Sequence, residues 1–232
     1  MSSLLLRLAA PLQAWGLNNK FERRGTMREP TKSGVIGMIA AALGRSRDDS
    51  INDIACLPFG VRIDQPGRLL RDYHTAKSDF GKDTIVTERY YLADAIFLAG
   101  LEGEASVLHN IDMALCSPFY PLFLGRRSCP PVGKMSLGLR DTSLKDALCN
   151  EPWQASQWFV DRVPKKFFLT IMMDTEQKSI LRRRDYPISY SQKHRKYTFR
   201  YIDDFSIDVS EIQKKDYTWV ETDHDPFSEL GG

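Results

Sequence analysis

The sequence predicts an α+β fold whose first half alternates strands and helices and whose second half is rich in strands. In the first 128 residues, apolar segments follow the order strand, helix, strand, hairpin, strand, helix, strand. Beyond Cys129 the pattern changes to short β-prone segments. The first order is that of a ferredoxin-like (RRM-like) domain with a hairpin inserted between its second and third core strands. We therefore expect such a domain over residues 1–128 and a smaller β-rich C-terminal part over residues 129–232.

The first elements are predicted from local signals. Residues 4–9 are short and apolar and end before Pro11, which favours a buried strand over a helix. A polar, basic loop without periodicity continues to Glu29. The clearest helix opens at residues 30–33, places apolar side chains on one face and stops at Gly44.

The remaining core elements follow in the same order. Residues 68–75 and 84–91 are polar and β-prone, and together they predict a long inserted hairpin over about residues 68–91. The other expected elements are a short helix after residues 48–50, strands over residues 59–63, 93–101 and 119–124, and a helix over residues 104–115.

The C-terminal part begins at a break, because residues 130–133 contain two prolines and a glycine. A short helix is expected over residues 143–149. The strands expected after it cover residues 167–173, 179–184, 197–202 and 205–209.

The composition is that of an ordinary soluble globular protein, with 42% hydrophobic and 27% charged residues. No stretch approaches the roughly 18 apolar residues of a membrane-spanning helix and no signal peptide is recognisable, so we expect a cytoplasmic protein without membrane contact. The 4 cysteines form no C-x-x-C pair and are expected to be free, mostly buried thiols. No metal-ligand spacing, P-loop or dinucleotide motif is present, so no metal and no cofactor are expected.

Charge is segregated along the chain although the net charge is only +2. Residues 182–200 contain seven Lys and Arg residues and one acidic residue, and residues 7–32 contain six Lys and Arg residues and two acidic residues. Residues 203–229 reverse the sign, with nine acids against two lysines. Such basic segments are typical of a protein that binds a polyanion, but solvated faces of a soluble protein explain them equally well.

Four motifs at residues 12–16, 30–37, 70–75 and 122–130 carry the specific signal. Together they resemble the CasD family, the repeat-associated (RAMP-type) subunit of the type I-E CRISPR Cascade complex, over residues 4–131. This resemblance implies a non-catalytic RNA-binding subunit that caps the 5′ handle of crRNA. It also implies contacts with the CasC backbone and the large CasA subunit, and with target DNA through the complex.

The helix start and the basic loop before it are the first candidate RNA contacts. Thr31 can cap the helix and leave N–H groups for a phosphate, to which Lys32 adds a charge and Ser33 a hydroxyl. Alternatively, Thr31 only caps the helix and Lys32 is solvated. The loop residues that could follow the same RNA backbone are Lys20, Arg23, Arg24 and Arg28.

The hairpin and two further motifs supply the remaining candidates. Arg71, Tyr73 and His74 combine side chains that stack on unpaired bases and bind phosphate, although Tyr73 could instead pack on the inner face of the hairpin. Of the adjacent Arg126 and Arg127, at most one is expected to touch RNA. Gln13 is a further expected contact, whereas Trp15 beside it is expected in the core.

A metal-independent endoribonuclease that cleaves CRISPR repeat RNA is the alternative function, because a related CRISPR subunit has this activity. Such chemistry needs a general base and a cation near the phosphate. Of the 4 histidines, only His74 lies in a motif near basic residues, and Tyr73, His74 and Lys77 are the nearest approach to a catalytic set. We therefore expect that the protein is not an enzyme.

Overall fold

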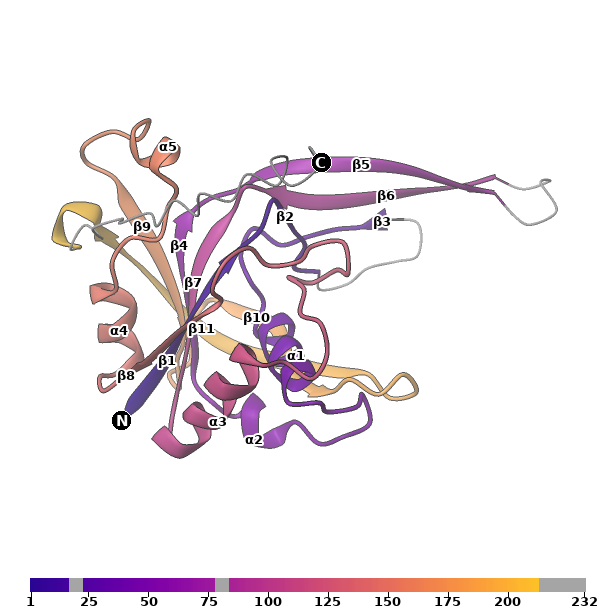
Figure 1. The fold of residues 1–232 in the computed structure, drawn as a ribbon, viewed down its shortest axis with the longest axis horizontal. Coiled ribbons are helices and arrows are strands. Elements are labelled where there is room, and N and C mark those ends of the chain that lie inside the picture. The colour runs from indigo at the N-terminus through magenta and orange to yellow at the C-terminus, as the bar shows by residue number, and fades with distance from the viewer. Residues whose placement is uncertain (17–22, 78–83, 213–232) are drawn as a thin grey trace, which may run out of the picture.

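The computed structural model describes residues 1–16, 23–77 and 84–212. Its main sheet has seven strands in the order β10–β11–β9–β4–β7–β1–β8, and all neighbours are antiparallel (Figure 1). The strands are β1 (Ser2–Ala9), β4 (Phe59–Gln65), β7 (Ile96–Gly103), β8 (Ser136–Arg140), β9 (Phe168–Asp174), β10 (Arg182–Ser189) and β11 (Lys196–Asp208). The fold is therefore mixed α and β, with a mostly antiparallel sheet.

Helices cover both faces of this sheet. Alternate side chains of β1 point to opposite faces, so Leu4, Leu6 and Leu8 lie in the core with α1 (Lys32–Ala42), α2 (Asn52–Ala55) and α3 (Ala105–Cys116). Leu5 belongs to a second core with α4 (Leu144–Asn150). The two remaining short helices are α5 (Gln157–Val160) and the 3-10 turn η1 (Val209–Glu211).

Glycines let α4 approach the sheet closely. A methyl group at Gly100 of β7 would collide with Leu144, and one at Gly60 of β4 would collide with Leu148. The two leucines therefore fill the space that side chains on these strands would occupy.

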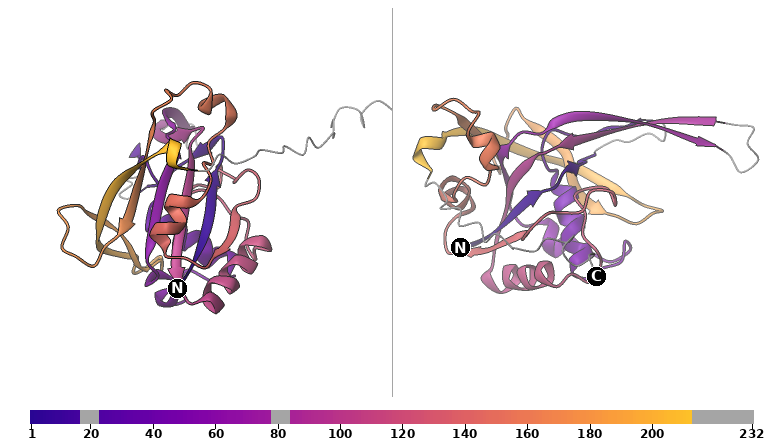
Figure 2. Two further views of the ribbon diagram at one scale, coloured as in Figure 1. Left: turned by 90° about the vertical axis from the view of Figure 1, so that its left-hand side faces the viewer. Right: turned by 45° about the horizontal axis from the view of Figure 1, so that its top comes forward.

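The inserted hairpin belongs to a second sheet. Its strands, β5 (Arg68–Lys77) and β6 (Thr84–Ala93), pair over their whole length, which confirms the predicted hairpin. The short strands β2 (Leu12–Gln13) and β3 (Arg23–Arg24) also pair with β6, β3 in parallel. Figures 1 and 2 show the hairpin extending far from the main sheet.

The expected strand over residues 119–124 is wrong. Its place beside β1 is taken by β8, which begins twelve residues later at Ser136. Pro121 has no N–H group to donate to a neighbouring strand. The segment instead provides hydrogen-bond donors for the free carbonyl groups at the end of α1. The N–H groups of Phe119 and Tyr120 donate to the Ala42 and Ala41 carbonyls at 3.0 and 3.3 Å.

The C-terminal strands extend the main sheet through the pairing of β9 with β4. Of residues 205–209, expected as a separate strand, residues 205–208 continue β11 and residue 209 begins η1. The strand expected at residues 179–184 lies later, at β10. The division at residue 128 stays a prediction.

The cysteines and the membrane expectation can be compared with the described residues. All 4 cysteines are free, but Cys56 and Cys116 are exposed, so the expectation that most are buried is wrong. In the part of the chain that the structure describes, no helix is long and apolar enough to cross a membrane. The cytoplasmic location stays a prediction.

Candidate nucleic-acid interface

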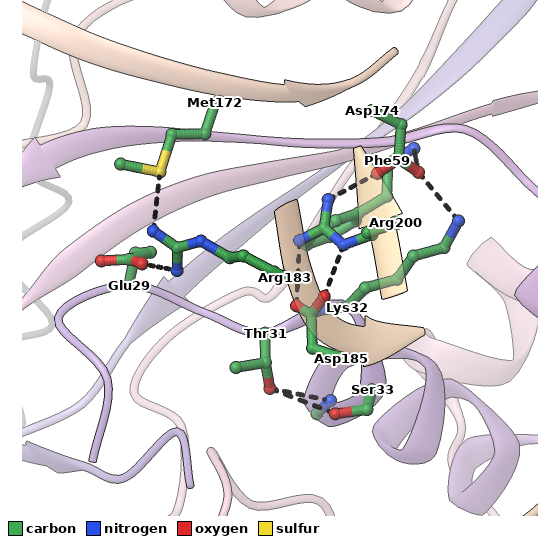
Figure 3. A network of polar contacts seen from close by, with 11 residues as sticks. Glu29, Thr31, Lys32, Ser33, Phe59, Met172, Asp174, Arg183, Asp185 and Arg200 are labelled. Atoms are coloured by element: carbon green, nitrogen blue, oxygen red, sulfur yellow. Dashed lines mark hydrogen bonds and ion pairs between the residues drawn. The ribbon is translucent and has the colours of Figure 1, made fainter. Parts of the chain in front are cut away.

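The start of α1 is occupied by the protein's own carboxylate. Thr31 caps the helix as expected and accepts from the Gly34 N–H at 3.2 Å. The Lys32 N–H, however, donates to Asp185 Oδ2 at 2.9 Å, and Lys32 Nζ lies 2.8 Å from Asp174 Oδ2 (Figure 3). With Lys32 only 2% exposed, the expected phosphate site at this helix start is wrong: Asp185 fills the position that a phosphate would take.

A four-membered charge network surrounds this helix start. Arg200 donates to both oxygens of Asp185, at 2.6 and 2.9 Å, and to Asp174 at 2.5 Å (Figure 3). Two cations therefore balance two carboxylates. Burial lowers the pKa of Lys32, although Asp174 opposes that shift. Because the carboxylates and Arg200 lie on β9, β10 and β11, the network fastens the C-terminal strands to α1.

Ser33 and Gln13 are also directed inward. The Ser33 carbonyl accepts from the Tyr190 hydroxyl, and the Ser33 side chain is buried. Gln13 is fully buried, donates to the Ala95 carbonyl at 2.7 Å and accepts from the Trp15 indole at 3.0 Å. Gln13 therefore supports the core, and the expectation that it contacts RNA is wrong. Trp15 lies in the core as predicted.

The basic loop comes to lie beside the hairpin. Arg23 and Arg24 form β3, opposite Glu88 and Arg89 of β6, and both arginines are exposed. The Arg23 guanidinium lies 5.1 Å from the Tyr90 ring centroid and donates to its hydroxyl at 3.3 Å. Two arginines that precede α1 in sequence thus widen the hairpin surface. Arg28 is exposed, and Lys20 lies outside the described residues.

The hairpin presents its candidate residues on two faces. Its register places Arg71 and Tyr73 on one face, with His74 on the other. Arg71 pairs with Glu88 on its own face. Tyr73 is 59% exposed, so the alternative that it packs against the protein is wrong. His74 Nδ1 lies 3.8 Å from Asp72.

Arg126 links β3 to the base of the hairpin. Its guanidinium lies 4.6 Å from the Tyr91 ring centroid and donates to the Arg24 carbonyl at 2.8 Å. Gly125 has φ of +91°, and a side chain there would collide with the Ala14 carbonyl. The tight turn at Gly125 therefore directs Arg126 toward the hairpin, while its neighbour Arg127 is exposed.

A cavity of about 880 Å³ lies between α1, residues 120–130 and the β10–β11 connection. Four arginines line this cavity. Arg45 pairs with Asp53, whereas Arg47, Arg127 and Arg195 make no ion pair within the described residues. The basic and tyrosine side chains that line the cavity are Arg45, Arg47, Arg127, Arg195, Tyr120 and Tyr190. Cations and rings around a hollow of this size suit a nucleotide.

Sequence reasoning singled out only Arg127 as a contact among these lining residues. Arg195 belongs to the basic segment at residues 182–200, which was a usable signal. Arg45, Arg47 and Tyr120 lie in separate segments without a motif, and only the folded chain brings them together.

Among the residues that the structure describes, no set of groups is assembled for the catalytic alternative. Tyr73 and His74 point to opposite faces of the hairpin, and His109 and His194 are exposed on α3 and beyond β10. Within residues 1–16, 23–77 and 84–212, no three His, Cys, Asp or Glu side chains gather as metal ligands would.

An exposed basic surface on a projecting hairpin, next to a cation-lined cavity, defines a candidate nucleic-acid-binding protein. The family model described as CRISPR-associated protein (Cas_Cas5) matches residues 3–203. The chain belongs to this Cas5 family, which confirms the resemblance seen in its motifs.

Individual relatives agree with this assignment. The chain is 39% identical over 158 residues to the CRISPR system Cascade subunit CasD of Escherichia coli (strain K12), covering 59% of this chain and 70% of CasD. A crystal structure of a Cas protein is 34% identical with a TM-score of 0.73, covering 92% of this chain and 98% of that one. A chain of a CRISPR RNA-guided surveillance complex is 31% identical with a TM-score of 0.77, covering 93% and 95%.

Proposed function

We propose that this protein is a non-catalytic RNA-binding subunit of a type I-E Cascade complex and caps the 5′ handle of crRNA. The observation that carries the proposal is that Arg126 joins Arg24, on β3 beside the hairpin, to the turn whose next residue, Arg127, lines the cavity. The similarity to CasD and to a surveillance-complex chain supports the setting. In that setting its partners are the CasC backbone, the large CasA subunit and, through the complex, target DNA.

The proposed RNA path uses both parts of this surface. Arg24 and Arg127 are exposed and bind phosphates of the handle, and Arg23 and Arg71 extend the path along the hairpin. Tyr73 offers an exposed ring on which an unpaired base stacks. Base stacking tolerates any base, so this arrangement recognises the handle mainly through the phosphate backbone and the shape of the RNA.

The proposal includes the finer fold class. The order β8–β1–β7–β4, with α1 and α3 on one face, supports a ferredoxin-like (RRM-like) core with an inserted hairpin. In this assignment β8, not residues 119–124, is the fourth core strand, and β9, β10 and β11 extend the sheet.

The absence of catalysis is also part of the proposal. General acid–base cleavage of RNA needs a base within hydrogen-bond reach of the 2′-hydroxyl and a cation at the same phosphate. The two hairpin side chains that could share this work, Tyr73 and His74, point away from each other. The geometry therefore supports binding without cleavage.

Salt-dependent RNA affinity tests the proposal. Each single-strand phosphate contact contributes roughly 0.7 to the slope of log K against log salt. The double variant Arg24→Ala with Arg127→Ala should therefore lower the magnitude of that slope for a handle oligonucleotide by roughly 1.4. Lys145→Ala, which removes an exposed cation on α4, is the matched control and should leave the slope unchanged.

Two results would contradict the proposal. An unchanged slope in the double variant would show that the RNA lies elsewhere. Cleavage of labelled repeat RNA by the purified protein in EDTA, giving one defined product, would establish the endoribonuclease instead.

A further inference from the structure

A second basic and aromatic surface lies at residues 157–168, in α5 and the connection to β9. The preceding residue, Ser156, anchors α5 to the main sheet, donating from its N–H and hydroxyl to Gln65 Oε1 at 3.0 and 2.7 Å. Gln65 ends β4 just before the hairpin begins at Arg68. The surface therefore adjoins the base of the hairpin, at the opposite end from its tip (Figures 1 and 2).

The inner side of this segment is fully packed. Phe167 stacks on Trp153 with ring centroids 5.8 Å apart, and Phe159 meets Phe167 edge-on at 5.9 Å. The Trp153 indole donates to the Asp64 carbonyl at 2.8 Å. Because these contacts already complete a small core with Leu169, the segment has a firm base.

Two further aromatic rings point outward instead. Trp158 is 43% exposed and Phe168 is 51% exposed. The Arg162 guanidinium lies 5.5 Å from the Trp158 ring, and Lys166 Nζ lies 5.5 Å from the Phe168 ring. Each exposed ring therefore has a cation beside it.

The cations of this segment lie outside any close ion pair among the described residues, although Asp208 on β11 is near enough to Lys166 for that cation, after the hydrogen bonds from Ser210, to help lower the pKa of the carboxyl. Arg162, Lys165 and Lys166 are exposed and make no ion pair within the described residues. The one acid of the segment, Asp161, accepts from Gln157 at 2.7 Å. Three cations against one acid leave residues 157–168 with a net charge of +2. The nearby Asp208 on β11 accepts from the Ser210 N–H and hydroxyl.

We propose that residues 157–168 form a second binding surface for single-stranded nucleic acid, separate from the hairpin and the cavity. Exposed rings with a cation beside each one match a nucleic-acid strand, which offers both bases and phosphates. The cations Lys165 and Lys166 bind phosphates, and Trp158 stacks on a base. This surface is independent of the handle site, because it shares no residue with that site.

Oligonucleotide binding by the full-length protein tests the proposal. The probes are fluorescein-labelled (dT)₂₀ and (U)₂₀, which separate a DNA strand from an RNA strand. In the Arg24→Ala/Arg127→Ala background, at least one probe should still bind. Adding Lys165→Ala and Lys166→Ala should then lower the magnitude of the slope of log K against log salt for that probe by roughly 1.4. In otherwise wild-type protein, this lysine pair should leave affinity for the handle RNA unchanged.

Replacement of the aromatic ring supplies an independent readout. Trp158→Ala should weaken binding of the preferred probe roughly 5- to 100-fold, and Trp158→Phe should weaken it far less because a ring remains. Lys145→Ala is the control, and an unchanged melting temperature shows that the variants fold. Unchanged probe affinity in the lysine and tryptophan variants would overturn the proposal. Equal loss of handle and probe binding in the lysine variant would show one continuous site and would also overturn it.

Discussion

Replacing Asp185 with asparagine should destabilise the protein strongly. Asp185 is fully buried and accepts three hydrogen bonds, two from Arg200 and one from the Lys32 N–H. The amide of Asp185→Asn has similar size but no charge, and its NH₂ group can only donate. The variant therefore keeps two buried cations, Lys32 and Arg200, against the single carboxylate of Asp174.

The magnitude follows from this imbalance. Removing one partner of a buried ion pair costs about 3–5 kcal/mol, because the opposite charge stays desolvated. For a chain of this size, a loss of 1 kcal/mol lowers the melting temperature by about 2–4 °C. Asp185→Asn should thus melt roughly 6–20 °C below the wild type.

Thermal and urea unfolding followed by circular dichroism measure this loss. The matched control is Asp203→Asn, an exposed acid on β11, which should change the free energy of unfolding by less than about 0.5 kcal/mol. The double variant with Lys32→Met should recover part of the loss, because it removes one unbalanced cation. An Asp185→Asn protein within 1 kcal/mol of the wild type would refute the network as a source of stability.

Three further predictions follow from single positions. Gly125→Ala should lower the free energy of unfolding by more than about 1 kcal/mol, since the positive φ and the Ala14 carbonyl both oppose a side chain; an unchanged urea midpoint would contradict this. Burial raises the pKa of Tyr190 above its usual 10.0, so above pH 10 the folded protein keeps a proton that the unfolded chain releases. The wild type should then lose stability relative to Tyr190→Phe by about 1.4 kcal/mol per pH unit, and parallel stability–pH profiles of the two proteins would exclude Tyr190 as the source. Tyr73→Ala should weaken binding of a handle oligonucleotide by about 1–3 kcal/mol without lowering the melting temperature, whereas His74→Ala, on the opposite face, should differ from it; equal losses would contradict the two-face register.

The sequence predicted those elements whose signals are local. The run at residues 4–9, the helix opened by Thr31 and the hairpin at residues 68–91 are each marked by their own periodicity and end signals. The strand at residues 119–124 failed because an apolar run does not reveal its hydrogen-bond partner. Its N–H groups complete the end of α1, and β8 takes its place beside β1.

The candidate site was predictable only in part, for a related reason. A cap followed by Lys32 has the same sequence pattern whether the helix start holds a phosphate or an internal carboxylate, and Asp185 lies far along the chain. Arg23 and Arg24 were identified by composition, but their pairing with the hairpin was not. The cavity is assembled from segments that share no motif, so the residues that line it could be identified only from the folded structure.

The bond between Lys32 and Asp185 joins residues that are 153 positions apart, and this separation matters while the chain is being made. At about 5–20 residues per second, a ribosome adds Asp185 roughly 8–30 seconds after Lys32. Until Asp174 and then Asp185 are added, late in that interval, the nascent chain carries the lysine of α1 without the two carboxylates that surround it in the finished protein. Docking of α1 in its final state therefore waits for the last third of translation, and a ribosome that stalls before β10 leaves a product unable to close this part of its core.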